Sequence, residues 1–327
     1  MAPLSNRPLY DTSADKRLFV APPYWQRLFG WVHHGYQVLI HGERGSGRTS
    51  LLRQLQLRLR DDHIRVAFID ATQATGLGHL VALISQALIG QPSAVENLSE
   101  RARMLQSLLA GADPGAASTA VQDVVRSWGD AEAQVVLIDA PGAGKAIYEL
   151  FGRLRDELWR LELVWIVASD DADVAMILRP PADAFFDQQL RIDSWSHAEL
   201  AEMLSRRSHD LDVVPLVEAA SGNPRRALAL ARDVDDDGNL TRLLAREERL
   251  AAAGALSETH QRTLQAVEDL GQVSASDEQL LQLLSVGRPR AHRLLNDLAD
   301  AGLLATGSAQ ATGQGRPRKL YHVKEPT

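Results

Sequence analysis

The chain contains a glycine-rich stretch that decides its fold, Gly42-Glu43-Arg44-Gly45-Ser46-Gly47-Arg48-Thr49-Ser50. The apolar run Val38-Leu39-Ile40 precedes this stretch and predicts a strand. After it, leucines recur at helical spacing and predict a helix over residues 48–60. A glycine-rich turn between a strand and a helix is the setting that a phosphate-binding loop requires.

The spacing of the stretch is that of the Walker A pattern, G-x-x-x-x-G-K-[ST], with Arg48 where the lysine stands. Backbone N–H groups of such a loop bind phosphate, helped by the positive end of the helix dipole. Thr49 would supply a hydroxyl to Mg²⁺, and Arg48 a cation to the outer phosphates of ATP or ADP. The predicted nucleotide-binding residues of the loop are Gly42, Gly45, Ser46, Gly47, Arg48, Thr49 and Ser50. The alternative is a tight strand–helix turn that binds nothing.

The composition is that of a globular protein, because 45% of the residues are hydrophobic and 24% are charged. A length of 327 residues favours two or three domains. There is no cysteine, which excludes disulfides, cysteine zinc sites and thiol chemistry. No apolar run is long enough to span a membrane, and the polar residues 1–16 lack an apolar signal core. We therefore expect a cytoplasmic protein with no membrane partner.

Strands and helices alternate in the first part of the chain. The strands are expected at residues 36–40, 66–70, 134–139, 163–168 and 188–192, and the main helices at 24–32, 48–60, 78–89, 118–128 and 146–160. This alternation predicts an α/β fold, in which helices cover both faces of a parallel P-loop sheet.

From Ser196 onward the pattern is helical. A capping box opens the first helix at Ser196, and an acidic turn is expected at residues 233–238. The last part of the chain predicts three short helices and then two strands, at 303–305 and 320–323, which is the layout of a winged helix-turn-helix. The predicted domains are a P-loop nucleotide-binding α/β domain (1–194), a helical lid domain (195–253) and a winged helix-turn-helix domain (254–327).

The strand at residues 134–139 ends in Asp139, which is typical of a Walker B motif. Its carboxylate would hold Mg²⁺ directly or through water. The next position is Ala140, where many ATPases carry the glutamate that activates water. The alternative is an aspartate that caps the following turn.

Four further polar residues are candidates for contact with the γ-phosphate or the attacking water. Ser169 and Asp170 end the fourth strand, where a polar side chain could orient water or phosphate, although a strand-end polar residue without a role is an equal alternative. Arg179 could reach a neighbour's nucleotide as an arginine finger. Arg225 lies on the first turn of a helix in the lid and could contact the γ-phosphate; a surface arginine is the alternative.

Basic residues are concentrated near the C-terminus, although the net charge of the whole chain is -7. Seven basic residues face only two acidic ones between Val286 and Lys324, which points to an anionic partner. The predicted contacts to double-stranded DNA are Arg288, Arg290, His292 and Arg293 at the start of the recognition helix, and Arg316, Arg318 and Lys319 in the wing. A winged helix that contacts protein is the alternative.

In these motifs the chain resembles the AAA+ and STAND-type P-loop ATPases of the origin-recognition and archaeal-ATPase kind. The similarity extends from the lead-in Leu18-Phe19-Val20 through both Walker motifs to the winged helix. On this resemblance, Ser169 stands at the sensor-1 position and Arg225 is the sensor-2 arginine of the segment 222–228. The resemblance also implies ATP or ADP with Mg²⁺ as cofactors, and a homo-oligomer or a partner ATPase.

Together these features predict a nucleotide-binding protein whose ATP or ADP state controls a DNA-binding winged helix or self-assembly. Hydrolysis is expected to be weak or absent, because Arg48 and Ala140 replace residues on which hydrolysis depends in the resembled families. One alternative is an active AAA+ ATPase acting on DNA, in which Asp170 orients the attacking water. The other is a non-enzymatic adaptor whose winged helix binds a protein partner.

Overall fold

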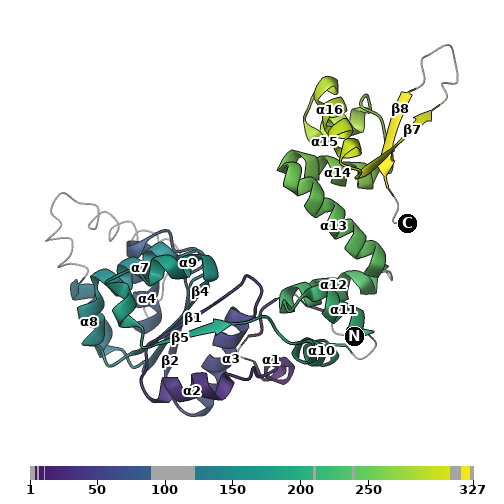
Figure 1. Ribbon diagram of the computed structural model, residues 1–327. Coiled ribbons are helices and arrows are strands. Elements are labelled where there is room, and N and C mark those ends of the chain that lie inside the picture. The colour runs from purple at the N-terminus through teal and green to yellow at the C-terminus, as the bar shows by residue number, and fades with distance from the viewer. Residues whose placement is uncertain are drawn as a thin grey trace, which may run out of the picture. The chain divides into compact units, whose positions relative to one another are not determined.

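The computed structural model describes residues 4–5, 7–10, 12–89, 122–208, 211–237, 240–309 and 318–324 (Figure 1). Contacts divide the chain into an N-terminal unit, Met1–Arg232, and a C-terminal unit, Asp233–Thr327. Within the described ranges, no helix is long and apolar enough to cross a membrane.

A five-stranded parallel sheet forms the centre of the N-terminal unit, in the order β2-β3-β4-β1-β5. The strands are β1 (Val38–Gly42), β2 (Val66–Asp70), β3 (Val135–Asp139), β4 (Val164–Asp170) and β5 (Gln188–Ile192). The predicted α/β fold class with a parallel sheet is therefore confirmed. The sequence did not predict the strand order, which places β4 between β1 and β3.

Helices cover both faces of this sheet, because successive strand residues point to opposite sides. Leu39 belongs to one apolar core, whereas Val38 and Ile40 belong to the other. The helices α4 (Leu77–Ile89) and α7 (Gly144–Arg153) pack against the first core, and α2 (Trp25–His33) and α3 (Arg48–Asp61) pack against the second (Figure 1).

Several elements of the N-terminal unit differ from the sequence prediction. The lead-in contains a helix, α1 (Ser13–Leu18), whose first turn is capped by the Thr12 hydroxyl. The predicted helix 146–160 is two helices, α7 and α8 (Arg155–Trp159). The fourth strand ends with Ser169 and Asp170, as predicted, and the unpredicted helix α9 (Asp171–Ile177) follows at once. Two aspartates in the first turn of α9 stabilise its start, because their negative charges lie near the positive end of the helix dipole.

Other segments lie partly outside the described residues. Of the predicted helix 118–128, residues 122–126 are helical, the 3-10 helix η1 (Ser127–Asp130) follows, and the earlier residues are outside. A second 3-10 helix, η2 (Ala182–Phe185), precedes β5.

Three helices complete the N-terminal unit: α10 (His197–Ser205), α11 (Val213–Ala220) and α12 (Pro224–Asp237), the last of which runs across the division between the units. The capping box at Ser196 and Glu199 is confirmed. The predicted acidic turn at 233–238 is wrong, since α12 stays helical through Asp237. Because the contacts group α10 and α11 with the sheet, the three-domain division with a separate lid stays a prediction.

The C-terminal unit has the predicted winged-helix layout. Its helices are α13 (Leu240–Leu256), α14 (Glu258–Leu270), α15 (Glu278–Leu284) and α16 (Arg288–Asp300), and its strands are β6 (Gln272–Val273), β7 (Leu304–Ala309) and β8 (Arg318–Val323). The strands form an antiparallel sheet in the order β6-β8-β7. The sequence did not predict β6, and the strands predicted at 303–305 and 320–323 are shorter than β7 and β8. The predicted apolar face of α16, Ala291, Leu294, Leu295 and Leu298, is buried.

Candidate nucleotide-binding site

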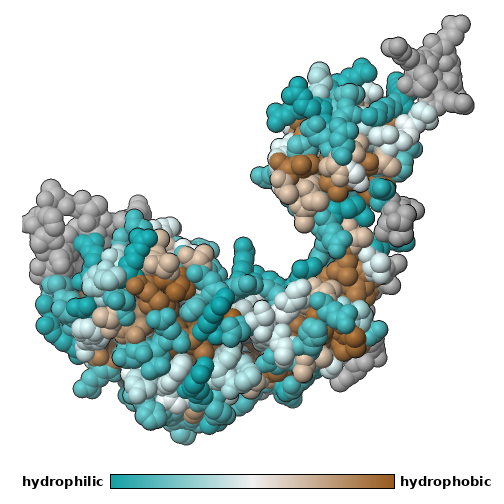
Figure 2. Space-filling view, viewed as in Figure 1, coloured by the Kyte–Doolittle hydropathy of each residue, from teal (hydrophilic) through white to brown (hydrophobic). Residues whose placement is uncertain are grey.

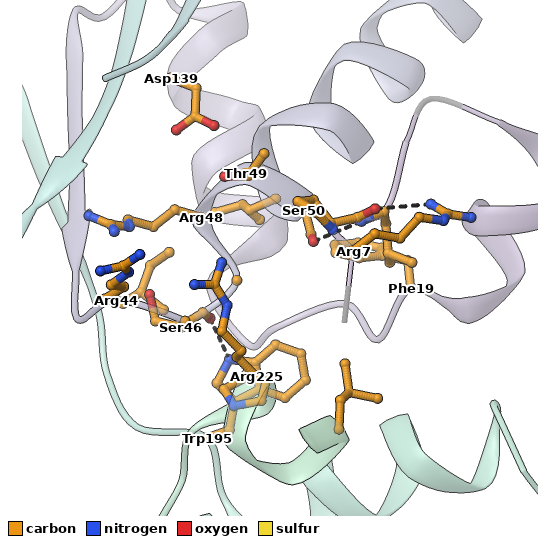
Figure 3. A pocket seen from close by; sticks show the side chains of 18 of the residues that line it. Arg7, Phe19, Arg44, Ser46, Arg48, Thr49, Ser50, Asp139, Trp195 and Arg225 are labelled. Atoms are coloured by element: carbon orange, nitrogen blue, oxygen red, sulfur yellow. Dashed lines mark hydrogen bonds between the residues drawn. The ribbon is translucent and has the colours of Figure 1, made fainter. Parts of the chain in front are cut away.

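A cavity of about 630 Å³ lies where the sheet strands end in the N-terminal unit (Figure 3). The glycine loop between β1 and α3 lines it, together with the strand-end residues Asp70, Asp139 and Asp170. The carboxyl edge of a parallel sheet is where such folds bind ligands, because the loops that follow neighbouring strands converge there. The predicted loop and the predicted Walker B aspartate are therefore brought to one place.

The glycine loop has the backbone shape that the sequence pattern requires. Gly45 and Gly47 have φ values of 92° and 101°, in the left-handed region that side chains disfavour. The hydroxyl of Ser46 is buried and, within the described part of the chain, has no hydrogen-bond partner. A buried orphan hydroxyl in a cradle of glycines fits a ligand that accepts hydrogen bonds, such as phosphate.

Arg48 is engaged by the protein itself. Its guanidinium donates to the backbone carbonyl of Ser169 and to the carboxylate of Asp170, and it is buried. The side chain therefore joins the start of α3 to the end of β4. In this conformation the cation expected to bind phosphate is already paired with a carboxylate, which would have to release it.

Asp139 is buried at the end of β3, beside Thr49 (Figure 3). Burial raises the pKa of Asp139 above its usual value; a hydrogen bond with Thr49 opposes this rise, and the neighbouring Asp70 carboxylate adds to it. Asp70 lies opposite Asp139 in the strand register. Thr49 and Asp139 together offer oxygen ligands of the kind that Mg²⁺ accepts alongside phosphate and water. Across the described residues there is no group of three or more His, Cys, Asp or Glu side chains that could hold a metal ion.

The remaining predicted catalytic residues lie away from the cavity. The buried Ser169 hydroxyl donates to the carbonyl of Ala140, at 3.3 Å, and approaches Asp173, and the residue does not line the cavity. Asp170, one residue later on β4, does line it, because alternate strand residues face opposite sides. Arg179 is exposed after α9 and is also outside the lining.

Residues that sequence reasoning missed hold the glycine loop from one side. The Trp195 indole N–H donates to the Ser46 carbonyl at 3.1 Å, and the Asn223 amide donates to the Arg44 carbonyl at 3.0 Å. The backbone N–H of Arg225 donates to the Gly45 carbonyl at 3.3 Å. The start of α12 therefore touches the loop directly. Only Arg225 was predicted here; the glycine before Asn223 marked a helix boundary without indicating its partner.

Three arginine side chains that line the cavity make no hydrogen bond or ion pair among the described residues, and one of them, the half-buried Arg207, interacts with the charge of Asp15. Arg44 and Arg225 both line the cavity, and in the ranges that the structure describes neither guanidinium makes a hydrogen bond or an ion pair (Figure 3). Arg225 is the arginine for which a γ-phosphate contact is predicted, and it lines the cavity. Arg44 was not predicted, because the Walker A pattern leaves its position open.

The N-terminal lead-in provides an apolar wall to the cavity. The backbone N–H of Leu9 donates to the Ser50 hydroxyl at 3.0 Å, and the Gln54 amide donates to the Tyr10 carbonyl at 2.6 Å. Ser50, a predicted nucleotide contact, thus binds the lead-in. The lead-in contributes Leu9, Leu18, Phe19, Val20, Pro22 and Tyr24 to the lining, and Met203 of α10 and Leu228 of α12 add to the apolar surface.

The predicted DNA contacts are exposed on the C-terminal unit. Arg288, Arg290, His292 and Arg293 of α16 and Arg318 and Lys319 of β8 all reach solvent, whereas Arg316 lies outside the described residues. Figure 2 shows a hydrophilic surface over α15 and α16. Asn296 links the helix to the wing, because its side-chain oxygen accepts from Lys319 and from the Tyr321 hydroxyl, each at 2.8 Å.

No protein-family model matches the chain, and no curated protein matches it. Among solved structures, it is similar to the Orc1 protein of Aeropyrum pernix in complex with DNA, with 16% identity, a TM-score of 0.45, and coverage of 98% of this chain and 94% of that one. It is also similar to Cdc6p of Pyrobaculum aerophilum, with 14% identity, a TM-score of 0.49, and coverage of 97% and 92%. A third match is AMPPCP-bound DnaA of Aquifex aeolicus, with 12% identity, a TM-score of 0.43, and coverage of 87% and 90%. All three similarities extend over most of the chain, at low identity.

Proposed function

We propose that the chain binds ATP or ADP with Mg²⁺ in the cavity beside the glycine loop, and that the bound nucleotide controls a DNA-binding winged helix or self-assembly. The observation that carries this proposal is the cradle itself. Two glycines with positive φ, a buried unpartnered hydroxyl and unpaired arginines surround one cavity. These features suit an anion with several acceptor oxygens, and the apolar wall suits a base.

The residues present fit Mg²⁺ as well as nucleotide. Thr49 and Asp139 would hold the ion, which when bound would neutralise charge between the phosphates. Burial raises the pKa of Asp139, and the Thr49 hydrogen bond and the charges of Arg48 and Arg53 oppose that rise only in part. Binding of Mg²⁺ would favour the charged form and offset the cost of burial.

Hydrolysis is weak or absent in this proposal, since no carboxylate follows Asp139 and Arg48 is paired with Asp170. Ala140 is fully buried and offers no base. Proton removal from water by a positioned base commonly contributes about 10²–10⁴-fold to a rate. Without that base, bound ATP would persist and act as a signal.

The test is nucleotide binding and phosphate release by the purified full chain. We expect Mg²⁺-dependent binding of ATP and ADP, with turnover far below about 1 s⁻¹, the lower end of ordinary enzyme rates. Turnover at or above that rate would support the alternative, an active ATPase. Asp170 lines the cavity and is the residue to which that alternative assigns the attacking water, so Asp170→Ala should then slow phosphate release.

DNA binding is tested separately, through its dependence on salt. The exposed basic residues of α16 and β8 predict that affinity for duplex DNA falls steeply as salt rises. Replacing Arg288, Arg290 and Arg293 with glutamine should lower the slope of log K against log salt by about 0.9 for each phosphate that the protein no longer neutralises. No binding to any duplex would favour the adaptor alternative, in which the winged helix contacts protein.

A further inference from the structure

Arg44 occupies a position of the glycine loop whose side chain the phosphate-binding pattern does not specify. The side chain nevertheless lines the cavity, and Figure 3 shows it directed toward the same space as Arg48 and Arg225. Its backbone is fixed, because the Arg44 carbonyl accepts from Asn223 and the Gly45 carbonyl accepts from the Arg225 N–H. The loop and the start of α12 therefore hold Arg44 and Arg225 near one another.

The cations of the cavity divide into paired and unpaired groups. Arg48 is paired with Asp170, Arg7 is paired with Asp15 at 2.7 Å, and the half-buried Arg207 interacts with the charge of Asp15. Arg44 and Arg225 have no such partner among the described residues. Two guanidinium groups held close together repel each other, and an anion that both can contact removes that repulsion. The N–H donors of Arg44 and Arg225 thus have no acceptor among the described residues, and the outer phosphates of a nucleotide would supply one.

We propose that Arg44 and Arg225 form a two-arginine clamp on the outer phosphates of a nucleoside triphosphate, with Arg44 supplying the loop cation that Arg48 does not. This inference rests on the proposed function and names the protein groups that recognise the phosphate chain. A guanidinium presents a fork of donors to phosphate oxygens, so two of them can bind a terminal phosphate from two sides. Because one arginine belongs to the loop and the other to α12, the clamp would tie α12 to the presence of the γ-phosphate.

The test compares the affinities of the full chain for ATP, ADP and AMP, in the unaltered protein and in three variants. Arg44→Gln removes the charge, Arg44→Lys keeps it without the fork, and Arg160→Gln is the matched control. Arg160 is an exposed arginine in the same unit and does not line the cavity. Arg44 is itself exposed, so we expect all variants to fold, which circular dichroism and Tm would verify.

We expect Arg44→Gln to weaken ATP binding about tenfold or more, the effect of removing a charge-assisted hydrogen bond, and to leave AMP binding unchanged. The ATP affinity of Arg44→Lys should lie between those of Arg44→Gln and the unaltered chain. The ATP affinity of Arg160→Gln should equal that of the unaltered chain. The double variant Arg44→Gln/Arg225→Gln should weaken binding by less than the sum of the two single effects in free energy, since both arginines act on one phosphate group.

Two outcomes overturn the clamp, and they are distinguishable. Tight ATP binding that Arg44→Gln leaves unchanged, or an equal weakening for ATP and AMP, would exclude the phosphate role of Arg44 while the proposed function stands. An unaltered chain that binds none of the three nucleotides would overturn the proposed function, and the clamp with it.

Discussion

At the scale of single residues, the ion pair between Arg48 and Asp170 decides whether the Arg48 guanidinium is free to contact a ligand in the cavity. Arg48 stands where phosphate-binding loops carry lysine, and the arginine fork reaches two acceptors of β4 at once. A lysine is a single point charge and could not satisfy both acceptors in the same way. The arginine of this loop therefore has a partner within the protein, and under the proposed function ATP would have to compete with that partner.

Asp170→Asn should strengthen ATP binding by removing this competition. A partly exposed ion pair contributes up to about 1 kcal/mol, so the expected gain is about fivefold in affinity. The neighbouring Asp171→Asn is the matched control, because Asp171 pairs with His41 and Arg191 and does not line the cavity. Titration with a fluorescent ATP analogue would measure both variants, and unchanged or weaker binding by Asp170→Asn would contradict the competition.

Asp139 predicts a pH dependence whose sign follows from its burial. A carboxyl whose pKa is raised in the folded state binds more protons there than in the unfolded chain, so it disfavours folding as pH rises past its usual value. Asp139→Asn should therefore raise Tm at pH 7 in the absence of Mg²⁺ and nucleotide. This gain in Tm should shrink toward acid pH, because residue 139 is then neutral in the unaltered chain as well as in the variant. A gain independent of pH would contradict this account, and Mg²⁺-dependent nucleotide binding should weaken in the same variant.

The sequence predicted some of these residues and not others for a physical reason. Asp139 was found because an apolar strand ending in aspartate is a local pattern. Ser169 and Asp170 were both expected at the end of the fourth strand, but the choice between them depends on which face of the strand borders the cavity, and that face changes with each position. The pairing of Arg48 was not predictable, since it depends on which strand lies beside β1.

At the scale of elements, the contact between the glycine loop and the start of α12 organises the site. A Cβ added at Gly45 would lie 2.7 Å from the Asn223 side-chain oxygen and 2.9 Å from the Arg225 Cβ. The two elements approach so closely only because position 45 has no side chain. The sequence predicted both elements and their start and stop signals, whereas their contact depends on how the intervening chain folds.

Gly45→Ala tests this contact against a matched glycine. Gly35 also has a positive φ, of 76°, but a Cβ there would meet nothing within 4 Å. Gly35→Ala should cost about 1 kcal/mol from backbone strain alone. Gly45→Ala should cost about 2–4 kcal/mol, because the clash adds to the strain, and should also weaken nucleotide binding. Thermal unfolding would compare the stability of the two variants, and ATP titration would compare their affinity for ATP. Equal losses of stability and affinity in both variants would show that the loop and α12 do not constrain each other.

At the scale of the whole molecule, the sequence predicted the kinds of structure in each region and their succession along the chain. Alternation of strands and helices predicted the parallel sheet, and the final three helices and hairpin predicted the winged helix. The order β2-β3-β4-β1-β5 was not predictable, because it depends on pairings between distant segments that leave no local pattern. The short strand β6 was missed for the same reason, since it consists of two residues paired to the far end of the chain.

The proposed function makes a prediction about the whole molecule that follows from thermodynamic linkage. If ATP changes the affinity for DNA by some factor relative to ADP, DNA must change the relative affinity for ATP and ADP by the same factor. We expect a difference of about fivefold or more, the usual lower range of such coupling. Anisotropy of a labelled duplex at fixed salt, with saturating ATP or ADP, would measure it. Equal DNA affinity in both states, with DNA binding intact, would leave self-assembly as the process under nucleotide control.

The position of Trp195 has a practical consequence. Of the six tryptophans of the chain, it lines the cavity, donates to the Ser46 carbonyl, and lies 3.6 Å from where a Cβ on Gly47 would stand. Indole emission responds to charge and water near the ring, so occupancy of the loop should alter the intrinsic fluorescence of the unlabelled protein. Trp128 and Trp165 are fully buried elsewhere and would supply a constant background. Trp195 fluorescence should therefore report ligand binding without an added label, and Trp195→Phe should abolish the change in fluorescence.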